Sequence, residues 1–270
     1  MSATVSEAIT RVAPLGVRFV DDVTGETVSD GLTVLYPKAG SDVPALAAVN
    51  HSGVFVLHGF AGTGEIEWGR GDEAFWTSPL PSVTARIELH DLLGRYHDTT
   101  FDARVPTRGL FAPLCGSPPS PPSTEPAVPL VSTPARPVPA GVAVLRATLR
   151  DADTGGPAAW ALLEVGTGRG VADARGEIAV LFPYPPLASF GGSPPASTRR
   201  PLLEEEWTVT IAGFYDRLAP DATPDLCDVL AQRRADTLQS LSPPTTVAPQ
   251  TLTYGRELVV PEPLHLAPAP

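Results

Sequence analysis

The sequence predicts an all-β protein made of two antiparallel Greek-key β-sandwich domains, the second carrying a short helical insertion. Its 270 residues include 32 prolines and 24 glycines, a usage that favours short strands joined by many turns. One local pattern also occurs twice: an alternating strand runs into Asp-x-x-Thr-Gly, and an Asn/Asp-x-x-Gly turn later opens another alternating strand. A chain of this length divides naturally into two domains of about 100 residues each.

The first copy of the pattern predicts a β-sandwich domain over residues 1–112. Its first strand, residues 17–21, runs into the turn from Asp21 to Gly25, and Asn50 begins the turn that opens a strand at residues 53–58. In the strands expected at 83–90 and 101–105, apolar residues alternate with polar ones. Such alternation is typical of half-buried antiparallel strands.

A proline-dense segment, residues 113–140, separates the two copies. Proline density of this kind disfavours both sheet ladders and helices, so we expect an extended, polyproline-like linker. The second sandwich is predicted over residues 141–260, and residues 261–270 are expected to form a loosely ordered proline-rich tail. Strands of the second domain are expected at residues 145–150, 160–165, 178–182, 207–211 and 257–260.

A helical pattern interrupts the second domain at about residues 224–240. Thr223 suits an N-cap and Pro224 suits the first helical turn. Leu226, Val229 and Leu230 recur at i, i+3 and i+4, which places them on one helix face. We expect this helix to close one end of its sandwich or to contact a partner protein, so these three residues are predicted partner contacts.

The first domain contains a second group of candidate contacts. Trp68, Phe75 and Trp76 are concentrated in a glycine-rich connection outside any alternating strand. Exposed aromatic side chains of this kind anchor protein interfaces or stack on sugars. The same residues could instead fold back over one open end of their own sandwich, and the sequence leaves both interpretations open.

The paired turn signals resemble the carboxypeptidase-regulatory or transthyretin-like β-sandwich repeat, over the strand-rich parts of both halves. This resemblance implies an Ig-like sandwich that serves as a noncatalytic adhesion, spacing or docking module. A second resemblance, over residues 138–147, 157–162 and 176–183, is to β proteins that accompany phage-tail-like contractile injection particles. It implies a structural subunit of such an assembly.

The charge of the chain and its lack of targeting signals exclude several classes of function. The formal net charge of -11 and the lack of clustered Lys/Arg argue against nucleic-acid binding. No stretch approaches the ~18 apolar residues of a membrane span, and residues 1–7 lack the basic and apolar regions of a secretory signal. We therefore expect cytoplasmic synthesis, with the chain forming part of a particle released from the cell. In that compartment Cys115 and Cys227 are expected to be free thiols.

No residue pattern in the sequence indicates a particular enzymatic reaction. The sequence His58-Gly59 after a strand resembles the opening of an α/β-hydrolase, but the Gly-x-Ser-x-Gly elbow is lacking. The turn from Asp151 to Gly155 could suggest a calcium loop, yet the EF-hand spacing is missing. The histidines have no close ligand spacing. We expect no enzyme activity, no cofactor and no metal.

The sequence thus favours a noncatalytic structural or adaptor subunit whose partners are other protein subunits of a larger assembly. Homo-oligomerisation stays open. The alternative is a carbohydrate-binding or adhesive β-sandwich module, which the aromatic residues of the first domain would serve.

Overall fold

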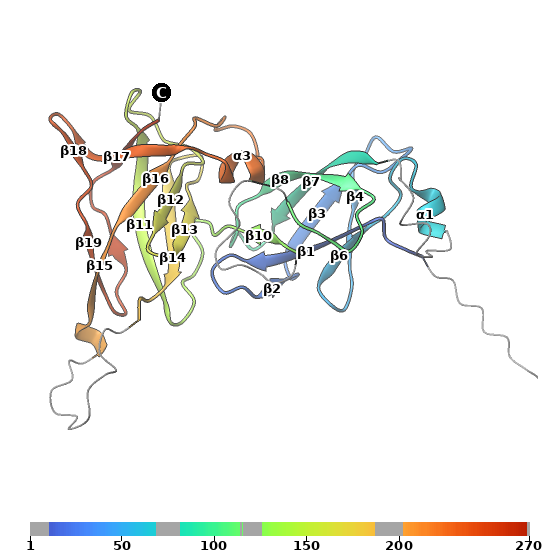
Figure 1. Cartoon of the computed structure of the whole chain (residues 1–270), viewed down its shortest axis with the longest axis horizontal. Helices are drawn as coiled ribbons and strands as arrows, with labels where there is room; N and C mark the ends of the chain where they lie inside the picture. Colours follow the sequence, from blue (N-terminus) through green and yellow to red (C-terminus); the bar gives the residue numbers. More distant parts are fainter. Residues whose placement is uncertain (1–10, 69–81, 114, 116–125, 187–201, 269–270) are drawn as a thin grey trace, which may run out of the picture.

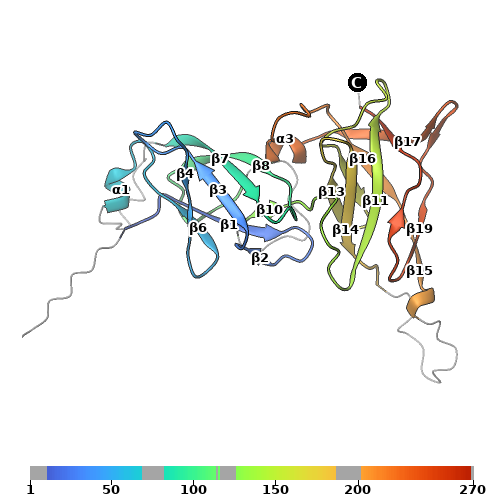
Figure 2. The same ribbon diagram turned by 180° about the vertical axis from the view of Figure 1, so that it is seen from behind.

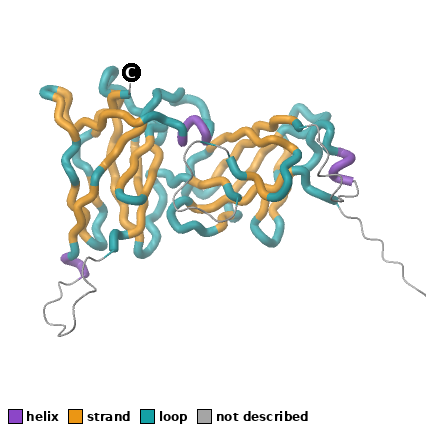
Figure 3. The backbone as a smooth tube through the Cα atoms, viewed as in Figure 1, coloured by secondary structure: helices purple, strands orange, loops and turns teal. Residues whose placement is uncertain are grey.

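The computed structural model describes residues 11–68, 82–113, 115, 126–186 and 202–268. These residues form two β-strand bodies side by side along the long axis of the molecule, with the short helix α3 between them (Figure 1). The view from behind shows the same arrangement (Figure 2). Strands dominate the regular structure and the helices are short (Figure 3). The prediction of an all-β sandwich fold is confirmed.

The first domain packs two sheets face to face. One has the strand order β10-β1-β6-β5, with β2 and β9 also paired to β1, and the other has the order β4-β3-β7-β8. The helix α1 (Gly64–Trp68) follows β6. The strands are β1 (Leu15–Asp21), β2 (Thr27–Val28), β3 (Leu32–Tyr36), β4 (Ala45–Leu46), β5 (Ala48–Val49), β6 (Val54–Leu57), β7 (Val83–Asp91), β8 (Thr99–Val105), β9 (Leu110–Phe111) and β10 (Val128–Leu130).

Phenylalanine rings form the centre of the first core. Phe19 and Phe101 are fully buried, and the Phe19 ring centroid lies 5.3 Å from that of Phe55 and 6.3 Å from that of Phe101. Strand β7 buries Ile87 and Leu89 on the face that its alternation predicts. The alternation of apolar and polar residues along β7 therefore determines which face of the strand is buried.

The second domain has one long sheet in the order β13-β12-β16-β17-β21-β11-β14, with β18 and β20 at its sides and a separate β15-β19 pair. Leu145, Leu149, Leu163 and Phe182 are buried in its core. The elements are β11 (Val142–Asp151), β12 (Leu162–Val165), β13 (Gly168–Val171), β14 (Glu177–Pro183), the 3-10 helix η2 (Leu202–Glu204), β15 (Glu206–Val209), β16 (Ile211–Phe214), α3 (Leu226–Leu230), β17 (Arg234–Leu241), β18 (Pro244–Thr246), β19 (Gln250–Thr253), β20 (Leu258–Val259) and β21 (Leu264–Ala267).

Two predicted elements of the second domain have different bounds in the structure. The strand expected at 207–211 is divided at Thr210, because β15 pairs with β19 whereas β16 pairs with β12. The helix expected at about 224–240 ends at Leu230, and β17 begins at Arg234. Asp225, not Thr223, caps the helix through the backbone N–H groups of Cys227 and Asp228. Pairing with β16 and β21 overrides the helical pattern beyond Leu230.

Two predictions are wrong for the same reason. Residues 113–140 are not a linker without sheet structure, and residues 261–270 are not a loosely ordered tail. Both segments supply the last strand of their sandwich: β10 pairs in parallel with β1, and β21 pairs in parallel with β11. Asp21 lies opposite Leu130, and Asp151 lies opposite Leu266. Pro129 is tolerated because β10 is an edge strand. The repeated unit therefore includes a proline-flanked final strand.

The repeated turns match bond for bond. The Asp21 carboxylate accepts the backbone N–H groups of residues 23 and 24 at 2.8 and 3.3 Å, and the Asp151 carboxylate accepts those of residues 153 and 154 at 2.9 and 3.1 Å. The second signal also matches: the Asn50 side chain accepts from residues 52 and 54, and the Asp173 side chain from residues 175 and 177. Asx turns of this kind explain the repeated sequence pattern.

Gly176 in the second of these turns is closely surrounded. Its φ is +77°, and a Cβ atom there would lie 2.2 Å from the carbonyl oxygen of Leu149. Gly155 has a similar φ of +70°, but nothing lies within 4 Å of its Cβ position. We expect Gly176→Ala to lower the free energy of unfolding by roughly 2 kcal/mol more than Gly155→Ala, because only Gly176→Ala adds overpacking to the shared backbone strain. Urea denaturation of both variants measures the difference, and equal costs would contradict this account.

Candidate functional site at the domain junction

The junction of the two domains is built around α3. This helix belongs to the second domain by sequence, yet Leu226 packs in the core of the first domain and is only 3% exposed. Val229, on the same helix, packs instead with Val131, Leu162 and Val171 between the domains. Leu226 of this helix is therefore buried in the core of the first domain, whereas Val229 is buried in the interface between the two domains.

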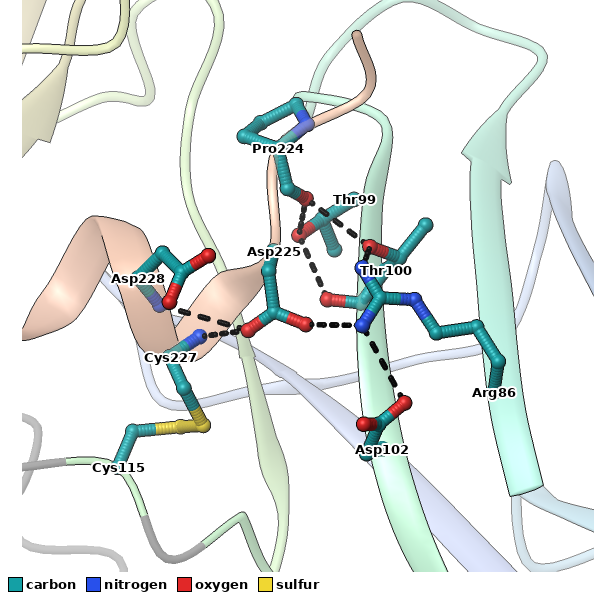
Figure 4. Close-up of a disulfide and its surroundings, with 9 residues drawn as sticks. All are labelled: Arg86, Thr99, Thr100, Asp102, Cys115, Pro224, Asp225, Cys227 and Asp228. Carbon is teal, nitrogen blue, oxygen red and sulfur yellow. Dashed lines mark hydrogen bonds and ion pairs between the residues drawn. A yellow bond between two sulfur atoms is a disulfide. The ribbon is translucent and has the colours of Figure 1, made fainter. Parts of the chain in front are cut away.

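Polar contacts fix the position of α3 on the edge strand β8 (Figure 4). The carbonyl oxygen of Pro224 accepts the backbone N–H of Thr100 at 3.0 Å and the hydroxyl of Thr99 at 3.1 Å. The carboxylate of Asp225, which caps the helix, also forms an ion pair with Arg86 of β7 at 2.7 Å. The edge of the first domain is thus covered by a segment of the second.

A disulfide between Cys115 and Cys227 joins α3 covalently to the first domain (Figure 4). The expectation of two free thiols is wrong, although the two cysteines are 112 positions apart in sequence. The physical reason is the docking of α3, which brings the two Cα atoms to 4.6 Å, within the range that a disulfide spans. Sequence separation concealed this proximity.

His97 extends the junction from the first domain. Its Nε2 lies 3.0 Å from the carbonyl oxygen of Val171, and its ring packs edge-on against Trp160 with centroids 5.8 Å apart. Burial lowers the pKa of His97, which keeps the imidazole neutral and lets Nε2–H donate to that carbonyl. Trp160 adopts a φ of 60° and donates its indole N–H to Ala219 at 3.0 Å. These residues hold the domains together and are not arranged for proton transfer.

The predicted contact residues have different positions in the structure. Leu226 and Val229 are buried inside the chain, so the prediction that they contact another protein is corrected: they contact its own first domain and interdomain cluster. Leu230 is half-buried beside them. Trp68 is 63% exposed, with the Arg11 guanidinium 5.0 Å from its ring centroid. Phe75 and Trp76 lie outside the described residues.

The turn aspartates also form two ionic clusters of matching composition, each with a buried aspartate and a buried tyrosine, that were not predicted from the sequence. In the first domain the Asp21 carboxylate binds the guanidinium of Arg136 and accepts the hydroxyl of Tyr96 at 3.1 Å. In the second, the Asp151 carboxylate binds Arg217 and accepts the hydroxyl of Tyr215 at 3.2 Å. Both tyrosines lie in equivalent connections, after β7 and after β16. The repeated Gly-x-Tyr at residues 94–96 and 213–215 is the sequence signal for them.

The arginines set the titration of these clusters. Burial raises the pKa of Asp21, but hydrogen bonds and charge from Arg136 outweigh it, so the net pKa lies below its usual value. Arg217 holds the pKa of Asp151 at about 2. Burial, together with the neighbouring aspartate, raises the pKa of each tyrosine to about 12. Because the Asp151 carboxylate is occupied by an arginine, a tyrosine and two backbone N–H groups, its chemistry is that of a structural ion pair and not of a calcium ligand.

The resemblance of His58-Gly59 to an oxyanion loop also has a structural explanation. The buried carboxylate of Glu67 lies against the backbone N–H of Gly59, accepts the Thr63 hydroxyl at 2.8 Å and binds Arg11. Burial lowers the pKa of the nearby His58, whose Nδ1 lies 3.4 Å from Glu67. This carboxylate therefore fixes the loop. Within the described residues, no group of three or more His, Cys, Asp or Glu side chains could hold a metal ion.

A cavity of about 300 Å³ opens between the domains near the junction. The first domain contributes Asp22, Pro129 and Val131 to its walls, and the second contributes the β12–β13 hairpin and Leu230. Within that hairpin Arg169 donates to Glu164 at 2.7 Å. Domain interfaces are common places for ligand pockets.

Gly168 and Gly170 of the same hairpin have a packing role. A Cβ atom at either position would lie 2.8 Å from a backbone carbonyl oxygen of β14. These two glycines of β13 are therefore needed for its close packing against β14.

Among the helices of the described residues, none is long and apolar enough to cross a membrane.

Comparison with known proteins does not assign the chain to a family. No protein-family model matches the chain, and it has no significant match among curated proteins or solved structures.

Proposed function

We propose that this chain is a noncatalytic structural adaptor, a subunit that holds two β-sandwich surfaces at a fixed orientation within a larger protein assembly. The observation that carries the proposal is the position of α3. A disulfide, an ion pair and a leucine buried in the opposite core connect the two domains through one short helix. Tandem domains that bind their ligands independently do not need a fixed relative orientation, because domains of one chain move relative to each other by default.

Further contacts around α3 support a fixed orientation. Val23 of the first repeated turn packs against Val144, Ala179 and Leu181 on the outer face of the β11–β14 pair. The guanidinium of Arg146 donates to the carbonyl oxygen of Pro134 in the connecting segment. The segment between the domains is therefore packed against both of them.

The disulfide also bears on where such an adaptor would work. Disulfides persist mainly in oxidising environments outside the cytosol. An assembly that is released from the cell would satisfy this condition. A contractile injection particle, whose accompanying β proteins the sequence resembles, is such an assembly. We therefore keep that type of particle as the specific form of the proposal.

A candidate partner surface lies at the corner of the first domain where the chain crosses from β4 to β5. Val43, Leu46 and Val49 are all exposed in this short segment, Leu46 by 65%. Exposed apolar side chains that occur together mark protein contacts more often than isolated ones. The glycan-binding alternative has less support, because the Arg11 guanidinium lies over the ring of the exposed Trp68.

The adaptor proposal predicts that Leu46→Asp reduces recovery of partner subunits by about tenfold, since a charge at the centre of an apolar contact costs more than 1 kcal/mol. The measurement is affinity purification of the tagged full chain from its native cells, followed by mass spectrometry of the bound proteins. Leu92→Asp is the matched control, because Leu92 is 75% exposed in the β7–β8 turn. If the wild-type chain recovers no defined set of proteins, or if both variants behave alike, the proposal fails.

A further inference from the structure

Asp22 carries a carboxylate at a position where the fold does not require one. The equivalent residue in the second repeated turn is Ala152, and that turn has the same hydrogen bonds. Both residues donate their backbone N–H to the final parallel strand of their domain, Asp22 to Leu130 at 3.3 Å and Ala152 to Leu266 at 2.9 Å. The side chain of Asp22 therefore has no part in the turn.

The Asp22 carboxylate also lacks a direct partner. Within the described ranges it accepts no hydrogen bond and forms no ion pair, and it lines the cavity between the domains. Burial raises its pKa to about 6; the charge of Arg169 opposes this shift and that of Asp21 adds to it. Arg169 is itself bound by Glu164. Asp22 is half-buried by solvent exposure, and a carboxylate on a cavity wall that serves neither the turn nor an ion pair is typical of a ligand-binding position.

We propose that this interdomain cavity binds a monocationic group, an alkylammonium or alkylguanidinium, with Asp22 as its carboxylate partner. The charged groups that face the cavity are Asp22, Glu164 and Arg169, and because Glu164 and Arg169 neutralise each other, one negative charge is left. The lining also includes apolar residues, which suit the aliphatic part of such a ligand. These residues are Pro129, Val131 and Leu230.

A volume of about 300 Å³ is at the lower end of the range for ligand sites, which limits the ligand to a small molecule or one side chain. A free amine and an Arg or Lys side chain on a bound protein offer the same chemistry. The site does not depend on the adaptor function, since a free amine would bind without any assembly.

The test is NMR titration of the full chain at pH 7 with two cationic probes, n-butylguanidinium and the tripeptide acetyl-Gly-Arg-Gly-amide, and with the neutral analogue butylurea. We expect at least one cation to bind at the cavity and butylurea not to bind. Binding of butylguanidinium indicates a free small cation as ligand, whereas binding of the tripeptide alone indicates a side chain presented by a protein. Failure of both cations overturns the proposal.

Variants make the assignment to Asp22 specific. Asp22→Asn should weaken binding at least tenfold, and Asp22→Ala, which introduces the residue of the equivalent turn, should do the same. Asp42→Asn removes an exposed carboxylate elsewhere and should leave the affinity unchanged. Equal binding by wild type and Asp22→Asn would overturn the proposal.

Two pH-dependent readouts follow from the ionisation of Asp22, which is opposed by burial and Asp21 and favoured by Arg169. Affinity should be about tenfold weaker at pH 5 than at pH 7, because a carboxyl group with a pKa of about 6 is mostly protonated at the lower pH. Without ligand, Asp22→Asn should raise the melting temperature at about pH 8 but not at about pH 4. An unchanged melting temperature at pH 8 would show that the ionised Asp22 carboxylate has no cost in the folded protein and would overturn the inference.

Discussion

Replacing Cys115 and Cys227 together by serine is expected to lower the free energy of unfolding by about 4 kcal/mol. The bond connects positions 112 residues apart, so it removes much of the conformational freedom of the unfolded chain. The bond also connects two domains with separate cores. Wild type should therefore unfold in one cooperative transition, whereas the double variant should unfold in two steps.

Guanidinium denaturation followed by both tryptophan fluorescence and circular dichroism measures these effects. Wild type treated with a reductant should reproduce the behaviour of the double variant, which controls for any effect of the serines themselves. A loss below 1 kcal/mol, or one transition in every sample, would contradict the role given to the disulfide. Such a result would also remove the main support for a fixed orientation of the domains.

Local pattern predicted the strands well because each strand buries one face. The alternation of β7 and the turns after β1 and β11 are set by residues that are adjacent in sequence. The errors occurred where distant segments decide the outcome. Pro129 lies in a strand because β1 offers it an edge, and residues 234–241 form β17 because β16 and β21 pair with them.

The candidate site was harder to predict for the same reason. The periodicity of Leu226 and Val229 correctly indicated a helix with an apolar face, but the surface that covers this face is the chain's own first domain. No spacing rule connects Cys115 with Cys227, or Asp21 with Arg136 across 115 positions. Asp22 and Arg169 face one cavity only because the domains dock.

Asp21→Asn and Asp151→Asn should have unequal effects on stability, although both residues occupy the same position of the repeated turn. An asparagine oxygen can keep the turn hydrogen bonds, so the substitution removes mainly the charge. Arg136 is only 7% exposed and would remain buried without its counter-ion, which typically costs about 3–5 kcal/mol. Arg217 is 45% exposed and keeps Asp153 as a partner, so we expect a loss of only about 1–2 kcal/mol for Asp151→Asn.

The comparison is sharpened by pH and by a rescue variant. Both carboxyl pKa values lie below their unfolded values, so the stability that these groups contribute is present at neutral pH and is lost as pH falls through the folded pKa, about 2 for Asp151. The difference between wild type and each variant should therefore shrink below about pH 4. Adding Arg136→Met to Asp21→Asn should recover most of the loss, because it removes the stranded charge. Equal losses for the two asparagine variants, or no recovery by Arg136→Met, would mean that the turn itself, and not the burial of its arginine, determines the cost.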